Sequence, residues 1–362
     1  MIVDPFVGGG TTAVEALALG RNCLGIDISS LAIFVSETKT LLVTDNEVAA
    51  LRAWAAKLPD CVNMSSHTVY FATGSHEGYY RNIDGKRFWR IRKAVEQALA
   101  SVLSLSGSAE QVARCVVLRT AQWALDGRVK LPTVAEFRKV LGQYATAAIE
   151  GSLEFRHAVE KSGRRGTRLC LNRSAAGLED SAEVVALGPP RLVLTSPPYP
   201  GIHVLYHRWQ VDGRKETPAP FLIANKLDGS GESYYTLGHR HNPGLKSYWI
   251  NLAKVLNSTV ALSDADTIFL QVVAFGEPEW QLPKYLEVCA AAGLTEMFLP
   301  ELESVDERLW REVPNRRWYA DQMGSIPASK EVVLFHRKMA DAVKRLPRPL
   351  LSSKLLADLP EA

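Results

Sequence analysis

The sequence has few cysteines and no long apolar run. Its 362 residues include five widely spaced cysteines and no Cys-x-x-Cys pair, which argues against a disulfide framework or a zinc site. No apolar run approaches the ~18 residues that a membrane span needs, and the start lacks the pattern of a signal peptide. No internal repeat or low-complexity tract is present. The sequence therefore predicts a globular, cytoplasmic protein with no membrane partner.

The sequence also has little excess charge, but its basic residues are clustered. The net charge is +3, which by itself says little about partners. Residues 81–93 hold six basic residues against one acid, and residues 156–173 hold six more against one. A single charge run is more often a solvated helix face. Phe88 and Trp89 within the first cluster favour a nucleic-acid surface there.

One stretch organises the chain. Residues 192–195 form a short apolar run that predicts a buried parallel strand, and two prolines shortly after it cannot continue a sheet. Ser196, Pro197, Pro198 and Tyr199 follow the strand, and we call them the diproline loop. Its fixed φ angles and missing donors leave carbonyl oxygens free, beside a hydroxyl and an aromatic ring. This predicts a pocket for a flat group with N–H donors, although a surface turn or a polyproline segment is the alternative.

The first 28 residues predict a nucleoside-binding unit. A strand ends at Asp4, and residues 5–10, which we call the glycine turn, lead into a helix that stops at Gly20. A second buried strand, Cys23–Ile28, then carries the acid Asp27, which can accept hydrogen bonds from ribose hydroxyls. The competing role for Asp27 is to cap the helix that starts near Ser29. The absence of a lysine after the glycines argues against a Walker-type phosphate loop.

Together, Asp4-Pro5-Phe6-Val7-Gly8-Gly9-Gly10-Thr11-Thr12 and Thr195-Ser196-Pro197-Pro198-Tyr199 resemble the paired motifs of the amino-group DNA methyltransferases. That family methylates N4 of cytosine or N6 of adenine with S-adenosylmethionine. The Ser-Pro-Pro-Tyr form is more similar to the cytosine branch, since the adenine branch usually carries Asp or Asn first. The helical insert and the tail lie outside the resemblance.

The resemblance implies roles for particular residues. The cofactor-binding residues are expected to be Asp4, Pro5, Phe6, Gly8, Gly10, Thr11, Thr12, Asp27, Ile28 and Asn172. In that assignment the main chain of the glycine turn wraps the amino-acid part of S-adenosylmethionine, Asp27 takes the ribose and Asn172 contacts the adenine. Asn172 could instead cap a turn. The catalytic residues are expected to be Ser196, Pro197, Pro198 and Tyr199, with no metal.

The expected fold is α/β: a Rossmann-like S-adenosylmethionine-dependent methyltransferase fold with a seven-stranded, mostly parallel sheet, helices on both faces and an inserted helical subdomain. The last strand is expected to run antiparallel between the fifth and the sixth. Helical spacing in residues 46–166 predicts the insert, with Thr133 and Glu136 at one helix start. The expected divisions are 1–45 (cofactor half), 46–166 (helical insert, for target recognition), 167–339 (catalytic half) and 340–362 (tail).

Residues 200–247 are rich in Gly, His, Tyr and Pro and predict a functional loop region. Its four histidines invite a metal hypothesis, which we reject because no acid or cysteine completes a ligand set: His203, His207, His239 and His241. Other side chains there are better candidates for walls of a base pocket: Tyr206, Trp209, Tyr234, Tyr235, Arg240 and Asn242.

The expected activity is transfer of a methyl group to the amino group of a flipped base, with DNA as partner and room for a cognate restriction endonuclease or a second subunit. Three alternatives stay open: a non-catalytic DNA-binding or scaffold subunit of a methyltransferase or restriction-modification complex, an RNA methyltransferase, and methylation of a protein amide. A strand at the very start leads us to expect that preceding sequence was lost, was trimmed or lies elsewhere in the chain.

Overall fold

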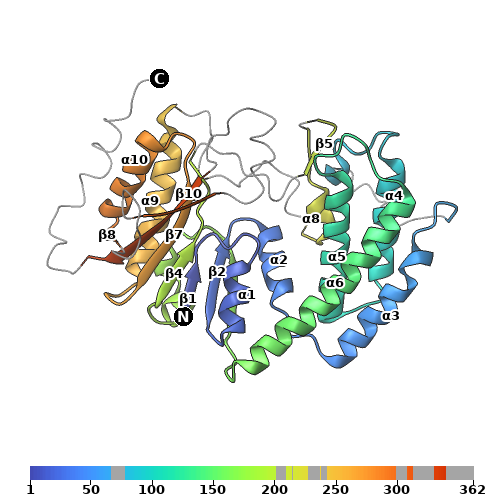
Figure 1. Cartoon of the computed structure of the whole chain (residues 1–362), viewed down its shortest axis with the longest axis horizontal. Helices are drawn as coiled ribbons and strands as arrows, with labels where there is room; N and C mark the ends of the chain where they lie inside the picture. Colours follow the sequence, from blue (N-terminus) through green and yellow to red (C-terminus); the bar gives the residue numbers. More distant parts are fainter. Residues whose placement is uncertain are drawn as a thin grey trace.

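A mixed sheet forms one side of the molecule, and a group of helices forms the other (Figure 1). The computed structural model describes residues 1–66, 78–200, 209–213, 215–226, 237, 243–298, 308–312 and 330–339. Within these residues the sheet has eight strands, seven of them in the order β3-β2-β1-β4-β7-β10-β8, with β9 also paired to β10. They are β1 (Ile2–Asp4), β2 (Cys23–Asp27), β3 (Arg168–Asn172), β4 (Leu192–Thr195), β7 (Ile268–Ala274), β8 (Leu294–Met297), β9 (Leu309–Glu312) and β10 (Lys330–Lys338).

Strand directions follow the expected pattern, and the strand count differs. Strands β3, β2, β1, β4 and β7 are parallel, and β10 runs antiparallel between β7 and β8. The sequence predicted seven strands and missed β9, which pairs with the first half of β10 while β8 pairs with its second half. The segment that forms β9, Leu-Trp-Arg-Glu, has only four residues and does not alternate apolar with charged positions, so it gives no signal of a strand.

Helices cover both faces of this sheet. Successive side chains of a strand point to opposite faces, so neighbouring residues report different layers. Ile2 and Cys23 pack with Ala13 and Ala16 of α1 (Thr11–Ala18). Val3 belongs instead to the core that includes residues of α9 (Lys246–Ala261) and α10 (Pro278–Ala291). Helix α1 therefore lies on one face, and α9 and α10 on the other.

A second hydrophobic core lies beside the sheet (Figure 1). Most of it is formed by a group of helices that come after β2 and before β3 in the sequence. Leu31 and Phe34 of α2 (Ser30–Lys39) also belong to it. Trp209 and Phe221, which follow the diproline loop in sequence, pack into the same core. Its elements are α3 (Asp45–Cys61), α4 (Trp89–Val102), α5 (Gly107–Leu125), α6 (Val134–Lys161), β5 (Trp209–Val211), β6 (Lys215–Thr217) and α8 (Ala219–Ile223). Three short helical segments complete the described elements: η2 (Leu178–Asp180), α7 (Ala182–Val185) and η3 (Pro243–Leu245).

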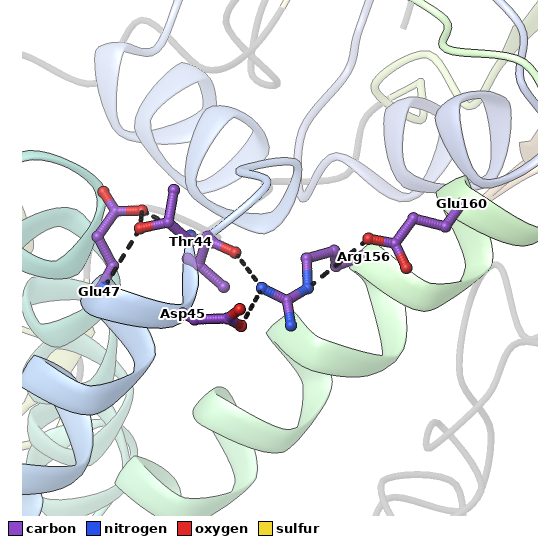
Figure 2. Close-up of polar contacts among 6 residues, drawn as sticks. Thr44, Asp45, Glu47, Arg156 and Glu160 are labelled. Carbon is purple, nitrogen blue, oxygen red and sulfur yellow. Dashed lines mark hydrogen bonds and ion pairs between the residues drawn. The ribbon is translucent and has the colours of Figure 1, made fainter.

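Two long helices of this group, α3 and α6, begin at capping boxes. Thr133 accepts from the backbone N–H of Glu136, and the Glu136 carboxylate accepts from the backbone N–H of Thr133, as the sequence predicted. Thr44 and Glu47 form the same arrangement at the start of α3, which Figure 2 shows. Because the first N–H groups of a helix lack partners within it, each box fixes the residue at which its helix starts.

One arginine joins the start of α3 to the end of α6 (Figure 2). Arg156 donates to the Val43 carbonyl at 2.9 Å and pairs with Asp45 at 2.9 Å. In Figure 1 the last turns of α6 lie beside α1, where Phe155 and Val159 pack against Leu17. These contacts attach the helical group to the sheet.

Candidate active site

The ends of β1 and β4 form the point where strand order reverses. From β1 the chain proceeds to β2 and β3 on one side, whereas β4 is followed by β7 on the other. Parallel sheets of this kind bind ligands in the crevice outside the carboxyl ends of the strands at such a reversal. The glycine turn follows β1 and the diproline loop follows β4, so the two predicted motifs meet at the same edge of the sheet.

The glycine turn is held from outside by α2. Ser36 donates to the Gly8 carbonyl at 3.2 Å, and the Lys39 ammonium donates to the Gly9 carbonyl at 2.7 Å. At Gly10 φ is +79°, and a Cβ would lie 2.7 Å from the Ser36 Cα. Only glycine fits that position. A Cβ at Gly8 would meet nothing closer than 3.8 Å, so the backbone there is open to a ligand.

Asp27 holds this turn through one of its two carboxylate oxygens. It accepts from the Gly8 N–H at 3.0 Å and from the Ser29 N–H at 2.9 Å, and burial raises its pKa while these backbone hydrogen bonds oppose the rise. The Ser29 contact lies at the start of α2, where the sequence allowed Asp27 to act as a cap. A carboxylate offers about four acceptor sites, so lone pairs remain for hydroxyl donors such as those of a ribose.

The end of β3 extends the same edge. Asn172 pairs in register with Asp27 and donates its amide N–H to the Asp27 carbonyl at 3.1 Å. Ile28 follows Asp27 with 42% of its surface exposed. An acid, an amide and an exposed apolar side chain in this order suit a nucleoside, with its ribose near Asp27 and its ring against Ile28.

A single carboxylate links the two motifs. Asp4 is buried at the end of β1, and its two oxygens accept from Thr195 Oγ1 at 2.7 Å and from Thr12 Oγ1 at 2.6 Å. The Phe6 N–H donates to the same carboxylate at 3.1 Å. Burial raises the pKa of Asp4 to about 6, although these hydrogen bonds lower it. Asp4 therefore ties the end of the diproline strand to the first turn of α1.

The remaining residues of the cofactor motif take less specific positions. Pro5 is buried, Phe6 is partly buried against the core that contains α9, and Thr11 is exposed as the first residue of α1. Thr11 therefore faces the same edge as the glycine turn, whereas Pro5 supports the turn from within.

The diproline loop is fastened by partners far away in sequence. Ser196 is exposed and donates to the Val272 carbonyl of β7 at 2.9 Å. The buried Tyr248 of α9 donates its hydroxyl to the Pro198 carbonyl at 2.7 Å. The Tyr199 hydroxyl lies 3.4 Å from Ser196 Oγ and donates to the carboxylate of Glu331 in β10. The loop thus presents Ser196 and Tyr199 side by side.

Sequence reasoning missed three of these contributors. Val272 acts through its carbonyl, Tyr248 reads as an ordinary core residue of an amphipathic helix, and Glu331 lies in a strand predicted only by its apolar pattern. Each is between 50 and 132 residues away from its partner in the loop. Glu331 did give one signal, since an acid that directly precedes a run of four apolar strand residues is costly to bury unless it has partners.

The two basic clusters divide between structural and exposed positions. In the first, Arg92 and Lys93 donate to backbone carbonyls of the helical group, whereas Trp89 is exposed and carries Arg90 over its ring. The second lines a pocket of about 620 Å³ through Arg156, Arg164 and Arg165. Arg168 begins β3 at the end of the sheet opposite the diproline loop, whereas Arg173 follows β3 at the carboxyl ends of the strands.

Other predictions fall partly outside the described residues. These include His203, Tyr206, His207, Tyr234, Tyr235, His239, Arg240, His241, Asn242 and the tail. Trp209 is described and is buried in the helical core, where it cannot line a base pocket. Among the described residues no group of three or more His, Cys, Asp and Glu could hold a metal ion. Likewise, no described helix has the length and apolar character to cross a membrane.

The fold is that of an α/β protein, compatible with a Rossmann-like fold, and its candidate site lies at the reversal of strand order. Comparison with known proteins adds a family. Residues 1–36 match a family model, N6_N4_Mtase, described as DNA methylase. The match runs from β1 into α2, so this segment is similar to the N6/N4 DNA methylase family.

A curated relative supports the same assignment over a short length. The type II methyltransferase M.MjaII of Methanocaldococcus jannaschii is 46% identical over 39 residues, which are 11% of this chain. The matched segment covers 7% of the length of that relative. No solved structure matches the chain.

Proposed function

We propose that the protein is a DNA methyltransferase that transfers a methyl group from S-adenosylmethionine to the exocyclic amino group of a flipped base, N4 of cytosine in preference to N6 of adenine. The observation that carries this proposal is the bridge through Asp4 between Thr12 and Thr195. It joins a nucleoside-binding turn to a diproline loop, so that a donor held by one lies beside an acceptor held by the other.

The residues of the first unit fit S-adenosylmethionine. Asp27 would take the ribose hydroxyls, Ile28 would support the adenine, and the open backbone at Gly8 would approach the amino-acid part. When bound there, the cofactor supplies an electrophilic methyl group on sulfur.

The diproline loop supplies acceptors for an amino group. Because Ser196 donates its proton to Val272, its lone pairs are available to accept one amino hydrogen. The Pro197 carbonyl, which has no hydrogen-bond partner among the described residues, would accept the other. These two contacts draw the nitrogen lone pair out of conjugation, so that it can form the new N–C bond as the C–S bond breaks. An amino proton then leaves to solvent.

The surface on the same side of the molecule suits DNA. Short links join α4 to α5 and α5 to α6, which makes neighbouring helices antiparallel. Since α6 runs toward the edge where β3 begins, α4 begins on the side of the diproline loop (Figure 1). Trp89 and Arg90, at that start, would contact the nucleic acid while Tyr199 stacks on the flipped base.

The test is incubation of the purified protein with methyl-labelled S-adenosylmethionine and duplex DNA of mixed sequence, with RNA as a separate arm. Nucleosides are then identified by mass. We expect N4-methylcytosine from the DNA arm. Label in adenine would overturn the preference for cytosine, label only in RNA would overturn DNA as substrate, and no labelled nucleoside would overturn the activity.

The variant Ser196→Ala separates chemistry from binding. We expect the single-turnover rate to fall by roughly 100-fold, because an amino-hydrogen acceptor is lost, and the dissociation constant of S-adenosylmethionine to stay within about twofold. Ser152→Ala is a matched control, since Ser152 only donates to a carbonyl of its own helix. Equal loss of rate and cofactor affinity in Ser196→Ala would show that Ser196 is structural.

A further inference from the structure

A buried carboxylate lies at the diproline loop without a role in either motif. Glu331 is the second residue of β10 and pairs in register with Ala274, the last residue of β7. The carboxyl end of β7 lies at the same sheet edge as that of β4, because the two strands are parallel. Glu331 is only 4% exposed. A buried acid needs partners, and its partners lie at the candidate site.

The two oxygens of this carboxylate have different partners. Oε1 accepts from the hydroxyl of Tyr199, and Oε2 accepts from Arg311 Nε at 2.7 Å. The Arg311 side chain is 53% exposed, whereas that of Glu331 is 6% exposed. The arginine therefore compensates the charge from the solvent side, and the tyrosine is the partner on the side of the loop.

The direction of these hydrogen bonds decides the state of Ser196. A tyrosine hydroxyl has one proton, and Glu331 accepts it. Tyr199 then has no proton to donate to Ser196 Oγ, although the two oxygens are 3.4 Å apart. Ser196 in turn donates its own proton to the Val272 carbonyl at 2.9 Å. Both lone pairs of Ser196 are thus left for an incoming N–H donor.

We propose that Glu331 is a positioning residue that fixes the Tyr199 hydroxyl as a donor and thereby keeps Ser196 an acceptor, so that the loop selects substrates carrying an amino group. This inference rests on the proposed methyl transfer. Without the carboxylate, Tyr199 could turn its proton toward Ser196, which would occupy one lone pair and loosen the ring that stacks on the base.

A double-mutant cycle tests the inference. Glu331→Gln keeps the shape of the side chain but offers amide donors, and Tyr199→Phe removes the hydroxyl through which Glu331 is proposed to act. We expect Glu331→Gln to lower the single-turnover rate about tenfold in the natural protein and less than about twofold in the Tyr199→Phe background. The dissociation constant of S-adenosylmethionine should stay within about twofold in all four proteins.

The same four proteins give a readout that needs no activity. In urea unfolding, the shift in midpoint caused by Glu331→Gln should be smaller in the Tyr199→Phe background, because the hydrogen bond between the two side chains is already lost. Arg311→Ala is the matched control, since it removes the other partner of the carboxylate and leaves the acceptor of Tyr199 in place. Its transfer rate should change less than about twofold.

Three results would overturn the inference. They are a tenfold loss in Glu331→Gln that persists in the Tyr199→Phe background, additive shifts in the unfolding midpoint, and an Arg311→Ala variant as slow as Glu331→Gln. If the natural protein transfers methyl groups and any of these is found, only the inference fails. If the natural protein transfers none, the proposed function fails and the inference with it.

Discussion

The glycine turn and the diproline loop lie at one sheet edge, but they are built in different ways. The turn is stabilised by Asp4, Asp27, Ser36 and Lys39, all within the first 39 residues. The loop is held by Val272, Tyr248 and Glu331, which are 50 to 132 residues away from it in sequence. A local unit keeps its geometry from its own sequence, whereas the loop depends on how three distant elements assemble. Substitutions in the two should therefore fail differently.

The largest effect on stability and cofactor binding is expected from a substitution in the glycine turn. Gly10→Ala forces a side chain into a left-handed backbone and to within 2.7 Å of the Ser36 Cα. We expect a loss of roughly 3–4 kcal/mol in the free energy of unfolding and no measurable binding of S-adenosylmethionine. Urea unfolding and a cofactor titration measure both.

Gly9→Ala is the matched control for that substitution. A Cβ there would meet only the flexible end of Lys39, at 3.8 Å. We expect its unfolding free energy to stay within about 0.5 kcal/mol of the natural protein. If Gly9→Ala and Gly10→Ala lost the same amount, the turn would not be held against α2 as the structure shows.

The same difference explains what sequence alone could predict. Strand, turn and helix of residues 2–18 follow from local signals, as does the capping box at Thr133, and both are confirmed. The antiparallel place of β10 was expected from the family resemblance and is also confirmed. The partners of the diproline loop could not be predicted, because no local pattern says that Tyr199 will meet Glu331. The burial of Trp209 was missed for the same reason. The long helices whose core it joins end at Lys161, which is 48 residues earlier in sequence.

The second largest effect on stability is expected for Asp4, which contacts both the glycine turn and the strand that leads into the diproline loop. The pKa of Asp4 is raised to about 6 from 3.8, so between about pH 4 and pH 6 the folded protein holds a proton that the unfolded chain has released. This contribution to stability is complete below pH 4 and is lost as pH rises through 6. The loss amounts to about 3 kcal/mol.

Asp4→Asn removes that titration and isolates it. The unfolding free energy of the natural protein minus that of Asp4→Asn should fall by about 3 kcal/mol from pH 4 to pH 7. Urea unfolding at five or so pH values measures the difference, and titrating groups elsewhere cancel in it. Parallel curves for the two proteins would show that Asp4 is not the buried, bridging acid described here.

The smallest effect is expected where the loop meets α9. Tyr248→Phe keeps the ring, which packs edge-on against Trp249, but removes the hydroxyl that donates to the Pro198 carbonyl at 2.7 Å. The Pro198 carbonyl is partly buried, so the loss of its donor costs about 1–2 kcal/mol at most, and this cost is relieved if the loop moves. We expect a severalfold lower single-turnover rate with unchanged affinity for S-adenosylmethionine, because the turn has its own supports.

Tyr285→Phe is the control, since Tyr285 is buried in the same core and donates to Gln271 instead of to the loop. It should lose similar stability and keep its rate. A loss of cofactor affinity in Tyr248→Phe would show that the loop and the turn are one mechanical unit, against the difference in construction from which these expectations follow.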